Sequence, residues 1–432
     1  QHDGVVGSAR RALGRVQDAI AAHAGGGPRP IAETTEFLVS HGAGSFLVND
    51  SGARLLDAVS GYGVASLGHS HPRWVDAVVS QANRVAVTSL HTEELAVYLS
   101  ALGGLLPERL GQVALLSTGA EAVELAVRLA QTERGRPGVL TFAHGFHGKT
   151  AAVRYATAPS SAEADALAPS WLRSAPFPSC ADHDAVDYDE CCEPVGYELA
   201  AIEQRADLAE IGAVLVEPVL GTSGNRPPKR GFLAGLRRLC DKRGWLLILD
   251  ESITGFGRTG ELFAFERFGV VPDVMVLSKG LGGGFPLSAV CASRELWERS
   301  GLTASATSSS FGGNPIACAA GMATLEIVTD ARFMAQVRAT SARAAVRLRQ
   351  LSQASAHVAR PRGVGLMLGF DLVDPATGEL ASAARCAEVV RACRDGGLLV
   401  AAHVPRVRLS PPLTLTVAEA DLLFDVLQDV LR

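Results

Sequence analysis

Short apolar runs of strand length alternate, through the middle of the chain, with amphipathic segments of helical periodicity. The runs that we expect to form strands are VALLS (113–117), VLTF (139–142), AVLVEP (213–218), WLLILD (245–250), VMVLS (274–278) and LSAVC (287–291). Their apolar residues are nearly continuous, which is typical of strands that are buried on both faces. Because helical segments separate them, these strands predict a mostly parallel sheet in an α/β fold.

The last part of the chain has a different pattern. Helices are predicted at 316–328, 331–353 and 417–431, with short strand-like pieces between the second and the third. This mixture indicates a smaller α+β domain.

Three units follow from these patterns. We expect an N-terminal segment (1–65) that joins the smaller domain through a hairpin, a large domain (66–320) and the smaller C-terminal domain (321–432). The stretch from about 155 to 200 is rich in Ala, Pro, Ser, Asp and Cys. It predicts a long irregular excursion over the surface.

The composition is that of a soluble globular protein, with 47% hydrophobic and 20% charged residues and a net charge of -5. No run of Lys and Arg points to a nucleic acid or a membrane surface as partner. No apolar stretch approaches the ~20 residues of a membrane span. We therefore expect neither kind of partner.

Cysteines give one further expectation. Three of the eight stand in apolar helix or strand contexts: Cys240, Cys291 and Cys318. Three others gather around His183: Cys180, Cys191 and Cys192. A metal site there is conceivable, but the spacing matches no tetrahedral zinc pattern well, so we expect free thiols and no metal. A reducing, cytoplasmic setting is then the default.

Lys279 and Asp250 are the most informative residues of the chain. Only four of the 40 Lys and Arg residues are lysines, and Lys279 follows an apolar run and precedes a row of glycines. Asp250 ends another apolar run. Pyridoxal phosphate (PLP) needs such a pair, an amine to form a Schiff base and a carboxylate to keep its pyridinium nitrogen protonated. Taken alone, Lys279 would equally suit a surface position at a strand end.

Strand ends carry further candidates. Ser117 and Glu217 also follow predicted strands, and ligands of parallel α/β sheets bind beyond the carboxyl ends of the strands. In STGAEAVELAVRLA, Thr118, Gly119 and Ala120 stand at a strand-to-helix turn, where backbone N–H groups can bind a phosphate. An ordinary capped helix explains the same residues equally well.

Three other motifs are ambiguous by themselves. In AHGFHGKT, Phe146 or His147 could stack on an aromatic ring, or the segment is a glycine-rich turn with one buried aromatic. In SSSFGGNP, Ser310 could add a phosphate contact, or the segment is a plain turn. In VRLSPPLT, Arg408 could bind a carboxylate in bidentate fashion, or be an exposed strand residue.

Taken in this order, the motifs resemble those of the class III aminotransferases, which are PLP enzymes of fold type I. The resemblance runs from YGVASLGHSHP, near residue 62, to RLSPPLT, near residue 413. It is most specific in DESITGFGRTG and SKGLGGGFPLSAV, with STGAEAVE and FGGNP adding to it. It implies the PLP-dependent transferase fold type I, with a large domain around a mostly parallel, seven-stranded sheet and a smaller α+β domain. It also implies a homodimer whose sites lie at the subunit interface.

The resemblance assigns roles to the cofactor-side residues. Lys279 would form the Schiff base and move the substrate proton, and Asp250 would pair with the pyridinium. Gly119 and Ala120, in the turn that begins at Thr118, would hold the phosphate. Phe146 would stack on the ring, beside His147.

Three more positions would serve the cofactor. Glu217 would lie near it. Ser310 would reach the phosphate from the neighbouring subunit. Ile253 stands where many members have a Gln bonded to the cofactor's phenolic oxygen.

On the substrate side, the resemblance makes Arg408 the ligand of a carboxylate. Lys149 replaces an arginine that binds a carboxylate in some members, and it keeps the charge but not the fork. Tyr62 matches a tyrosine near the substrate tail of ornithine-type members. Thr222 replaces a glutamate that often pairs with the arginine matching Arg408.

The function expected is that of an aminotransferase acting by a ping-pong mechanism. One partner would be a terminal amine, on a diamino acid or a larger biosynthetic intermediate, and the other a 2-oxo acid such as 2-oxoglutarate. A racemase, epimerase or decarboxylase on the same fold is the alternative. A non-catalytic binding protein would predict the loss of Lys279 or Asp250, and both are present.

Overall fold

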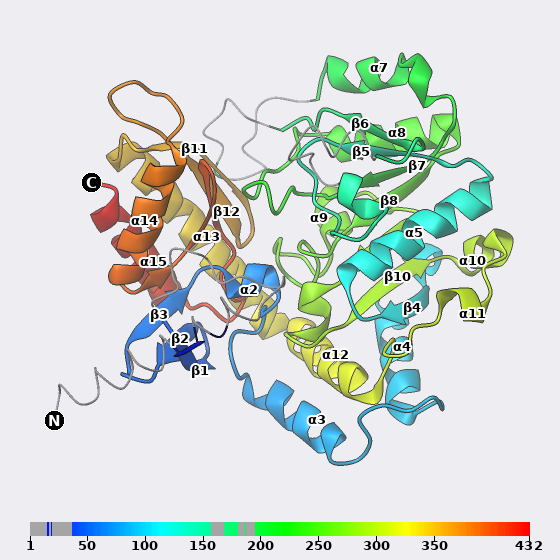
Figure 1. Ribbon diagram of the computed structural model, residues 1–432, viewed down its shortest axis with the longest axis horizontal. Helices are drawn as coiled ribbons and strands as arrows, with labels where there is room; N and C mark the ends of the chain where they lie inside the picture. Colours follow the sequence, from blue (N-terminus) through cyan, green and yellow to red (C-terminus); the bar gives the residue numbers. More distant parts are fainter. Residues whose placement is uncertain (1–14, 17–18, 20–36, 157–167, 180–185, 187–194) are drawn as a thin grey trace.

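The structure is a computed structural model, and it describes residues 15–16, 19, 37–156, 168–179, 186 and 195–432. Three sheets organise these residues. One seven-stranded sheet lies among the helices on one side of the molecule, and two four-stranded sheets lie on the other (Figure 1).

The large sheet has the strand order β4-β10-β9-β8-β7-β5-β6. Its strands are β4 (Gln112–Leu116), β5 (Gly138–Phe142), β6 (Leu172–Ala175), β7 (Ile211–Val216), β8 (Leu246–Asp250), β9 (Val274–Leu277) and β10 (Ser288–Ala292). Only β10 runs antiparallel to its neighbours. All six predicted strands and the mostly parallel α/β fold are confirmed.

The irregular excursion predicted for about 155–200 is wrong at two places. Residues 172–175 form the edge strand β6, which pairs with β5, and Tyr197–Glu203 form the helix α7. Because β6 is short and contains Arg173 and Ser174, it has no continuous apolar run from which a strand could be predicted.

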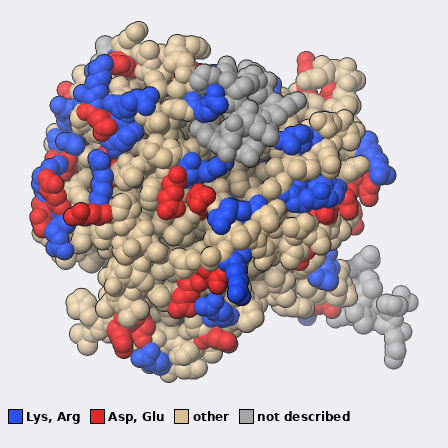
Figure 2. Space-filling model, turned by 180° about the vertical axis from the view of Figure 1, so that it is seen from behind, with Lys and Arg blue, Asp and Glu red and all other residues tan. Residues whose placement is uncertain are grey.

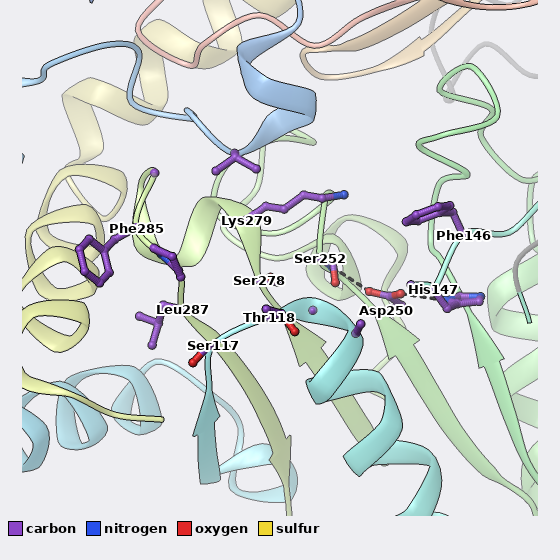
Figure 3. Close-up of a pocket in the computed structure, with 16 residues that line it drawn as sticks. Ser117, Thr118, Phe146, His147, Asp250, Ser252, Ser278, Lys279, Phe285 and Leu287 are labelled. Carbon is purple, nitrogen blue, oxygen red and sulfur yellow. Dashed lines mark hydrogen bonds and ion pairs between the residues drawn. The ribbon is translucent and has the colours of Figure 1, made fainter. Parts of the chain in front are cut away.

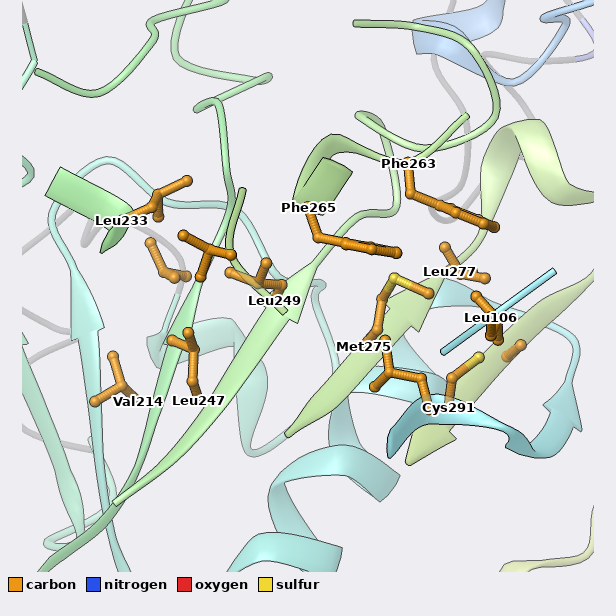
Figure 4. Packing of buried hydrophobic residues seen from close by; sticks show 14 of the residues in the cluster. Leu106, Val214, Leu233, Leu247, Leu249, Phe263, Phe265, Met275, Leu277 and Cys291 are labelled. Carbon is orange, nitrogen blue, oxygen red and sulfur yellow. The ribbon is translucent and has the colours of Figure 1, made fainter. Parts of the chain in front are cut away.

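Burial of the large sheet on both faces explains the continuous apolar runs. Along β8, Leu247 and Leu249 pack into a cluster with Met275 of β9, as Figure 4 shows. Leu246 and Ile248 point the opposite way, into a second cluster that includes the buried face of α5. Each such side chain contributes roughly 1.5–3 kcal/mol when it is fully buried.

Helices lie around the large sheet (Figure 1). They are α3 (Pro72–Ala82), α4 (Glu93–Gly104), α5 (Gly119–Arg134), α7, α8 (Phe232–Arg243), α9 (Ala264–Phe268), α10 (Arg294–Ser300), α11 (Ala304–Thr307) and α12 (Pro315–Val328). Short 3-10 turns lie at Glu108–Leu110, Val153–Tyr155, Ala206–Leu208 and Lys279–Gly282.

Two smaller sheets complete the molecule. The first contains β1 (Val39–Ala43), β2 (Phe46–Asn49), β3 (Arg54–Asp57) and β13 (Leu398–Leu399). The second contains β11 (Val358–Val364), β12 (Met367–Leu372), β15 (Arg406–Leu409) and β14 (Ala401–His403). Because β13 pairs with β3, the N-terminal hairpin is tied to the C-terminal part of the chain.

Two of the C-terminal helices agree with the sequence pattern. They are α13 (Ala331–Ala354) and α15 (Val417–Val430), whereas α14 (Ala383–Asp395) was not predicted; the short turn α2 (Ser60–Gly63) follows β3. The predicted helices at 316–328, 331–353 and 417–431 are therefore confirmed. The boundaries at 65/66 and 320/321 stay a prediction.

Two surface observations bear on partners. Among the described residues, no helix is both long enough and apolar enough to cross a membrane. Figure 2 shows basic and acidic side chains interspersed over one face of the molecule.

The cysteines divide into two groups. The buried thiols of the described part are free: Cys240, Cys291, Cys318, Cys386 and Cys393. The group of Cys180, Cys191 and Cys192 with His183 lies outside the described residues. Within the described residues no cluster of His, Cys, Asp and Glu suits a metal ion.

Replacing Phe263 by Ala tests the core above the strand ends. The buried ring stacks on Phe265 and meets Phe256 edge to face, each with centroids 5.6 Å apart. We expect a loss of about 3–5 kcal/mol of stability, because the removed ring leaves a cavity. The thermal midpoint, followed by circular dichroism, should fall clearly. The half-exposed Val346→Ala is the control and should change stability by less than about 0.5 kcal/mol. Equal midpoints for both variants would contradict this account.

Candidate active site

The carboxyl ends of several parallel strands converge on one cavity of about 350 Å³. Asp250 ends β8, Ser278 and Lys279 follow β9, and Ser117 follows β4. The cavity is lined by Val64, Ser117, Thr118, Gly119, Ala120, Phe146, His147, Gly148, Asp250, Ser252, Ser278, Lys279 and Gly284–Leu287. Figure 3 shows these side chains around the cavity. Parallel strands thus bring together residues that are far apart in the sequence.

Asp250 is a buried carboxylate held by two donors. Its Oδ2 atom lies 2.8 Å from Nδ1 of His147, and its Oδ1 accepts a hydrogen bond of 3.0 Å from the Ser252 amide. Burial alone would raise the pKa of Asp250, but the hydrogen bond and charge of His147 and the Ser252 contacts outweigh it, so the pKa is lowered. Asp250 therefore stays ionised, as a partner of a protonated ring nitrogen must.

The ring of His147 is engaged by Asp250. Instead of offering its ring for stacking, it is buried and bonded to Asp250. Phe146 is the partly exposed neighbour that lines the cavity. Of the two, only Phe146 is left to stack on a bound ring.

Lys279 reaches across the cavity toward Phe146 (Figure 3). Its backbone has φ 44, in the left-handed region that is costly for a residue with a side chain, and such strain often occurs at functional sites. Burial first, and the positive charge of Arg408 second, lower the pKa of its amine to about 8. The neutral, nucleophilic form of the amine is therefore much more populated near neutral pH than it is for an ordinary lysine.

The N-terminus of α5 closes another side. Thr118 caps the helix, and its side chain accepts a hydrogen bond of 3.3 Å from the Glu121 amide. The amides of Gly119 and Ala120, in the first turn, have no acceptor within the helix. A Cβ atom on Gly119 would come within 3.2 Å of Ser278 Oγ and 3.3 Å of Ser252 Oγ. Glycine therefore keeps open a cradle that suits a phosphate.

These residues fit PLP. An amine, an ionised carboxylate, a ring-sized aromatic face and a helix N-terminus with hydroxyl groups all border one cavity. These four groups match, in this order, the aldehyde, the ring nitrogen, the ring face and the phosphate of the cofactor.

A second cavity, of about 500 Å³, adjoins the first, because Val64, Phe146 and Lys279 line both. Its other lining residues are Gly61, Tyr62, Lys149, Thr222, Ala401, Ala402, His403 and Arg408. All three predicted substrate residues (Tyr62, Lys149 and Arg408) are therefore brought together here.

Arg408 is the buried charge of this second cavity. It is 5% exposed, and its guanidinium lies 5.1 Å from the centre of the Tyr62 ring. Its Nη1 donates to the Gly221 carbonyl at 3.5 Å, and no carboxylate among the described residues pairs with it. Burial lowers its pKa, although Tyr62 and Glu217 oppose the shift. A ligand carboxylate would neutralise this charge.

Glu217 ties two loops beside the cofactor cavity. Its Oε1 accepts from the Phe146 amide at 2.9 Å and its Oε2 from the Gly221 amide at 3.1 Å. Burial, with Asp250 adding to it, raises its pKa to about 6. Glu217 lines neither cavity itself, so it acts on the site through the loops it holds.

Two other predicted residues lie outside both cavities. Ile253 is buried in a small apolar cluster with Val219, Val364 and Met367. Ser310 is exposed, next to the exposed Phe311. A single chain therefore does not bring Ser310 to the cofactor cavity.

Sequence reasoning missed part of the lining. Gly284–Leu287 could have been included, because they directly follow the lysine loop. Val64 and His403 had no usable signal, since their approach depends on how the smaller sheets pack against the large one.

Comparison with known proteins agrees with this site. The family model "Aminotransferase class-III" matches residues 30–431. The chain is 38% identical to an acetylornithine aminotransferase of Mesorhizobium japonicum, over 88% of this chain and 89% of that one. It is 34% identical to a [LysW]-aminoadipate semialdehyde transaminase of Deinococcus radiodurans, over 92% and 86%.

Solved structures agree as well. The structure of an amine transaminase from an uncultivated Pseudomonas species, in its PLP-bound form, matches with a TM-score of 0.82 and 27% identity, over 95% of this chain and 97% of that one. The named relatives are aminotransferases, and none of them supports the alternative of a racemase, epimerase or decarboxylase. The chain belongs to the class III aminotransferases, and it is a PLP-dependent enzyme of fold type I.

Proposed function

We propose that this aminotransferase moves an amino group between a terminal amine, on a diamino acid or a larger biosynthetic intermediate, and a 2-oxo acid such as 2-oxoglutarate. The observation that carries the proposal is the pair of adjoining cavities, one with Lys279 and Asp250 and one with the unpaired Arg408. The names of the relatives, which refer to acetylornithine and [LysW]-aminoadipate semialdehyde, support a terminal amine. Both half-reactions would use the same cavities, which is a ping-pong scheme.

Lys279 is the proposed proton carrier. When bound, PLP supplies an electron-accepting ring that holds the amino group between donor and acceptor. The pKa of the Lys279 amine is lowered to about 8, close to neutral pH. The amine can therefore both take a proton from the reacting substrate carbon and return it. Lys279 lines both cavities, so its amine can reach the cofactor in one and the substrate in the other.

The remaining cofactor-side residues would hold and orient the cofactor. Asp250, fixed by His147, would keep the ring nitrogen protonated. Gly119 and Ala120, with the capped turn at Thr118, would bind the phosphate. Phe146 would cover the ring face.

The second cavity would hold the rest of the substrate. Arg408 would bind a carboxylate, and Tyr62 would keep the guanidinium in place by stacking on it. Thr222 lines this cavity without supplying a carboxylate, which favours direct binding of a substrate acid by Arg408. Lys149 would add a second positive charge near the mouth.

We further propose a homodimer in a cytoplasmic, biosynthetic setting. Ser310 and Phe311 are exposed on the single chain, and a second subunit would let Ser310 serve the partner's phosphate site. Ile253 and Glu217 would support the cofactor from behind the cavity wall.

An amine panel tests the function directly. The purified enzyme with PLP is mixed with single amines in the absence of any 2-oxo acid, and its absorbance is followed. We expect one class of terminal amine to convert the visible band to a near-ultraviolet band, and 2-oxoglutarate to restore it. A visible band that persists while the amine is inverted or decarboxylated would refute amino transfer.

Asp250→Asn tests the carboxylate. We expect covalent attachment of PLP to remain, while kcat falls by about 10²–10³-fold, the scale for one lost electrostatic partner in an active site. Covalent attachment is measured after borohydride reduction, and turnover with the amine found in the panel. Turnover within about twofold of wild type would show that the ring nitrogen needs no carboxylate here.

The pH dependence of cofactor capture tests Lys279. Because only the neutral amine is nucleophilic, uptake of PLP by the apoenzyme should accelerate as the pH rises through the pKa of Lys279, about 8. Arg408→Met removes a charge that lowers this pKa, so its midpoint should move to higher pH. Lys279→Ala is the control and should retain no cofactor after reduction. A midpoint near the ordinary lysine pKa of about 10.4 would contradict the assignment.

A further inference from the structure

One face of the small sheet β11-β12-β15-β14 borders the substrate cavity through His403 and Arg408. In the β14–β15 pair, Ala401 is opposite Arg408 and His403 is opposite Arg406. Side chains two residues apart share a face, so Arg406 and His403 lie on the face that Arg408 presents to the cavity. The intervening Val407 points the other way and is buried in the core of the smaller sheets.

This face is rich in arginine and poor in acid. Asp371 of β12 is its acidic residue among those described, and it is opposite Arg406 across the ladder. However, its carboxylate is taken by Arg362 at 2.9 Å and by Arg360 at 3.3 Å. No hydrogen bond or ion pair to a carboxylate is found for Arg406 in the described part of the chain. Its charge is therefore available to a ligand.

Arg226 approaches this arginine-rich face of the small sheet from the side of the large sheet. It follows the loop Gly221–Asn225, which packs on the small sheet, and the Gly224 carbonyl accepts from Arg362 Nε at 2.9 Å. A Cβ atom on Gly369 of β12 would lie only 2.5 Å from that carbonyl oxygen, so the close packing requires glycine there. Arg226 donates to the Ser179 hydroxyl and has no ion pair with a described carboxylate.

The charges of this group act on one another. Burial first, then Arg406 and Arg362, lower the pKa of Arg226 to about 10. Burial first, then Arg226, Arg406 and His403, lower the pKa of His144. Asp371 opposes this effect on Arg226, but it is the one acid of this face in the described part of the chain. The remaining excess of positive charge destabilises the free protein, and a bound anion would relieve that cost.

We propose that Arg406, Arg226 and His403 form an outer subsite that binds an acidic group, a carboxylate or a phosphate, at the far end of the amino substrate. The proposal rests on the proposed function, in which Arg408 holds a first acidic group. Positions two residues apart on a strand are about 6.6 Å apart, so the second acid lies well beyond the first. The substrate class is therefore an elongated amine that carries acidic groups at two depths of the cavity.

Chain length provides the test. The PLP-loaded enzyme is titrated calorimetrically with glutarate as a short diacid, suberate as a long diacid, octanoate as the matched monoacid, and the ω-phosphonate analogue of suberate. Arg406→Met keeps an unbranched apolar stem and removes the charged guanidinium. We expect this variant to bind suberate about tenfold more weakly, which is the scale of one charge-assisted hydrogen bond. Its affinity for glutarate and octanoate should fall by less than about twofold.

The control is Arg391→Met, an exposed arginine of α14, which should leave every affinity unchanged. Arg226→Met lies on a different element and should repeat the selective loss, so the test stands even if Arg406→Met fails to fold. Equal losses for short and long diacids, or no loss, would overturn the subsite. If suberate binds more tightly than its phosphonate analogue, the subsite is assigned to a carboxylate. If the phosphonate binds more tightly, the subsite is assigned to a phosphate.

These binding measurements need no turnover, so the two proposals can fail separately. Arg406-dependent binding of suberate without any amine that changes the visible band would leave the subsite and refute the proposed function. An amine that reacts normally, together with equal responses of suberate and glutarate to Arg406→Met, would leave the function and refute the subsite.

Discussion

The buried contact between His147 and Asp250 is the constraint on which the site depends. A carboxylate that is 3% exposed would normally take up a proton, and then could not stabilise a protonated ring nitrogen. The 2.8 Å contact to His147 and the amide of Ser252 keep it ionised. The strand β8 carries this group to the edge of the sheet, and its neighbour β9 and the more distant β4 carry Lys279 and the start of α5 to the same edge.

Charges across the two cavities set each other's protonation. Burial and Arg408 bring the pKa of Lys279 to about 8, while burial and Asp250 bring that of Glu217 to about 6. Both pKa values are thereby brought close to neutral pH, the range in which a group can accept and return a proton. Arg408 has two roles here. It lowers the pKa of Lys279, and it is the buried cation that a substrate carboxylate can neutralise.

The large and small sheets divide the work. Strand ends of the large sheet supply the residues that suit the cofactor, whereas the small sheet supplies Arg408, His403 and Arg406 on one face. The loop Gly221–Asn225 joins them, since it packs on Gly369 and is held by Glu217. A change of side chains on the small sheet could therefore alter the substrate without disturbing the chemistry at Lys279.

The sequence by itself determined the large sheet and the chemical core of the site. Six strands were predicted because both faces of that sheet are buried, and Asp250 and Lys279 were paired because parallel strands end at one edge. The edge strand β6 was missed because a short, half-polar strand has no periodic signal. Only the tertiary structure decided that His147 bonds to Asp250 and that Arg406 and His403 share a sheet face with Arg408. Those contacts depend on the register and packing of elements that are distant in the chain, and no local pattern of side chains encodes them.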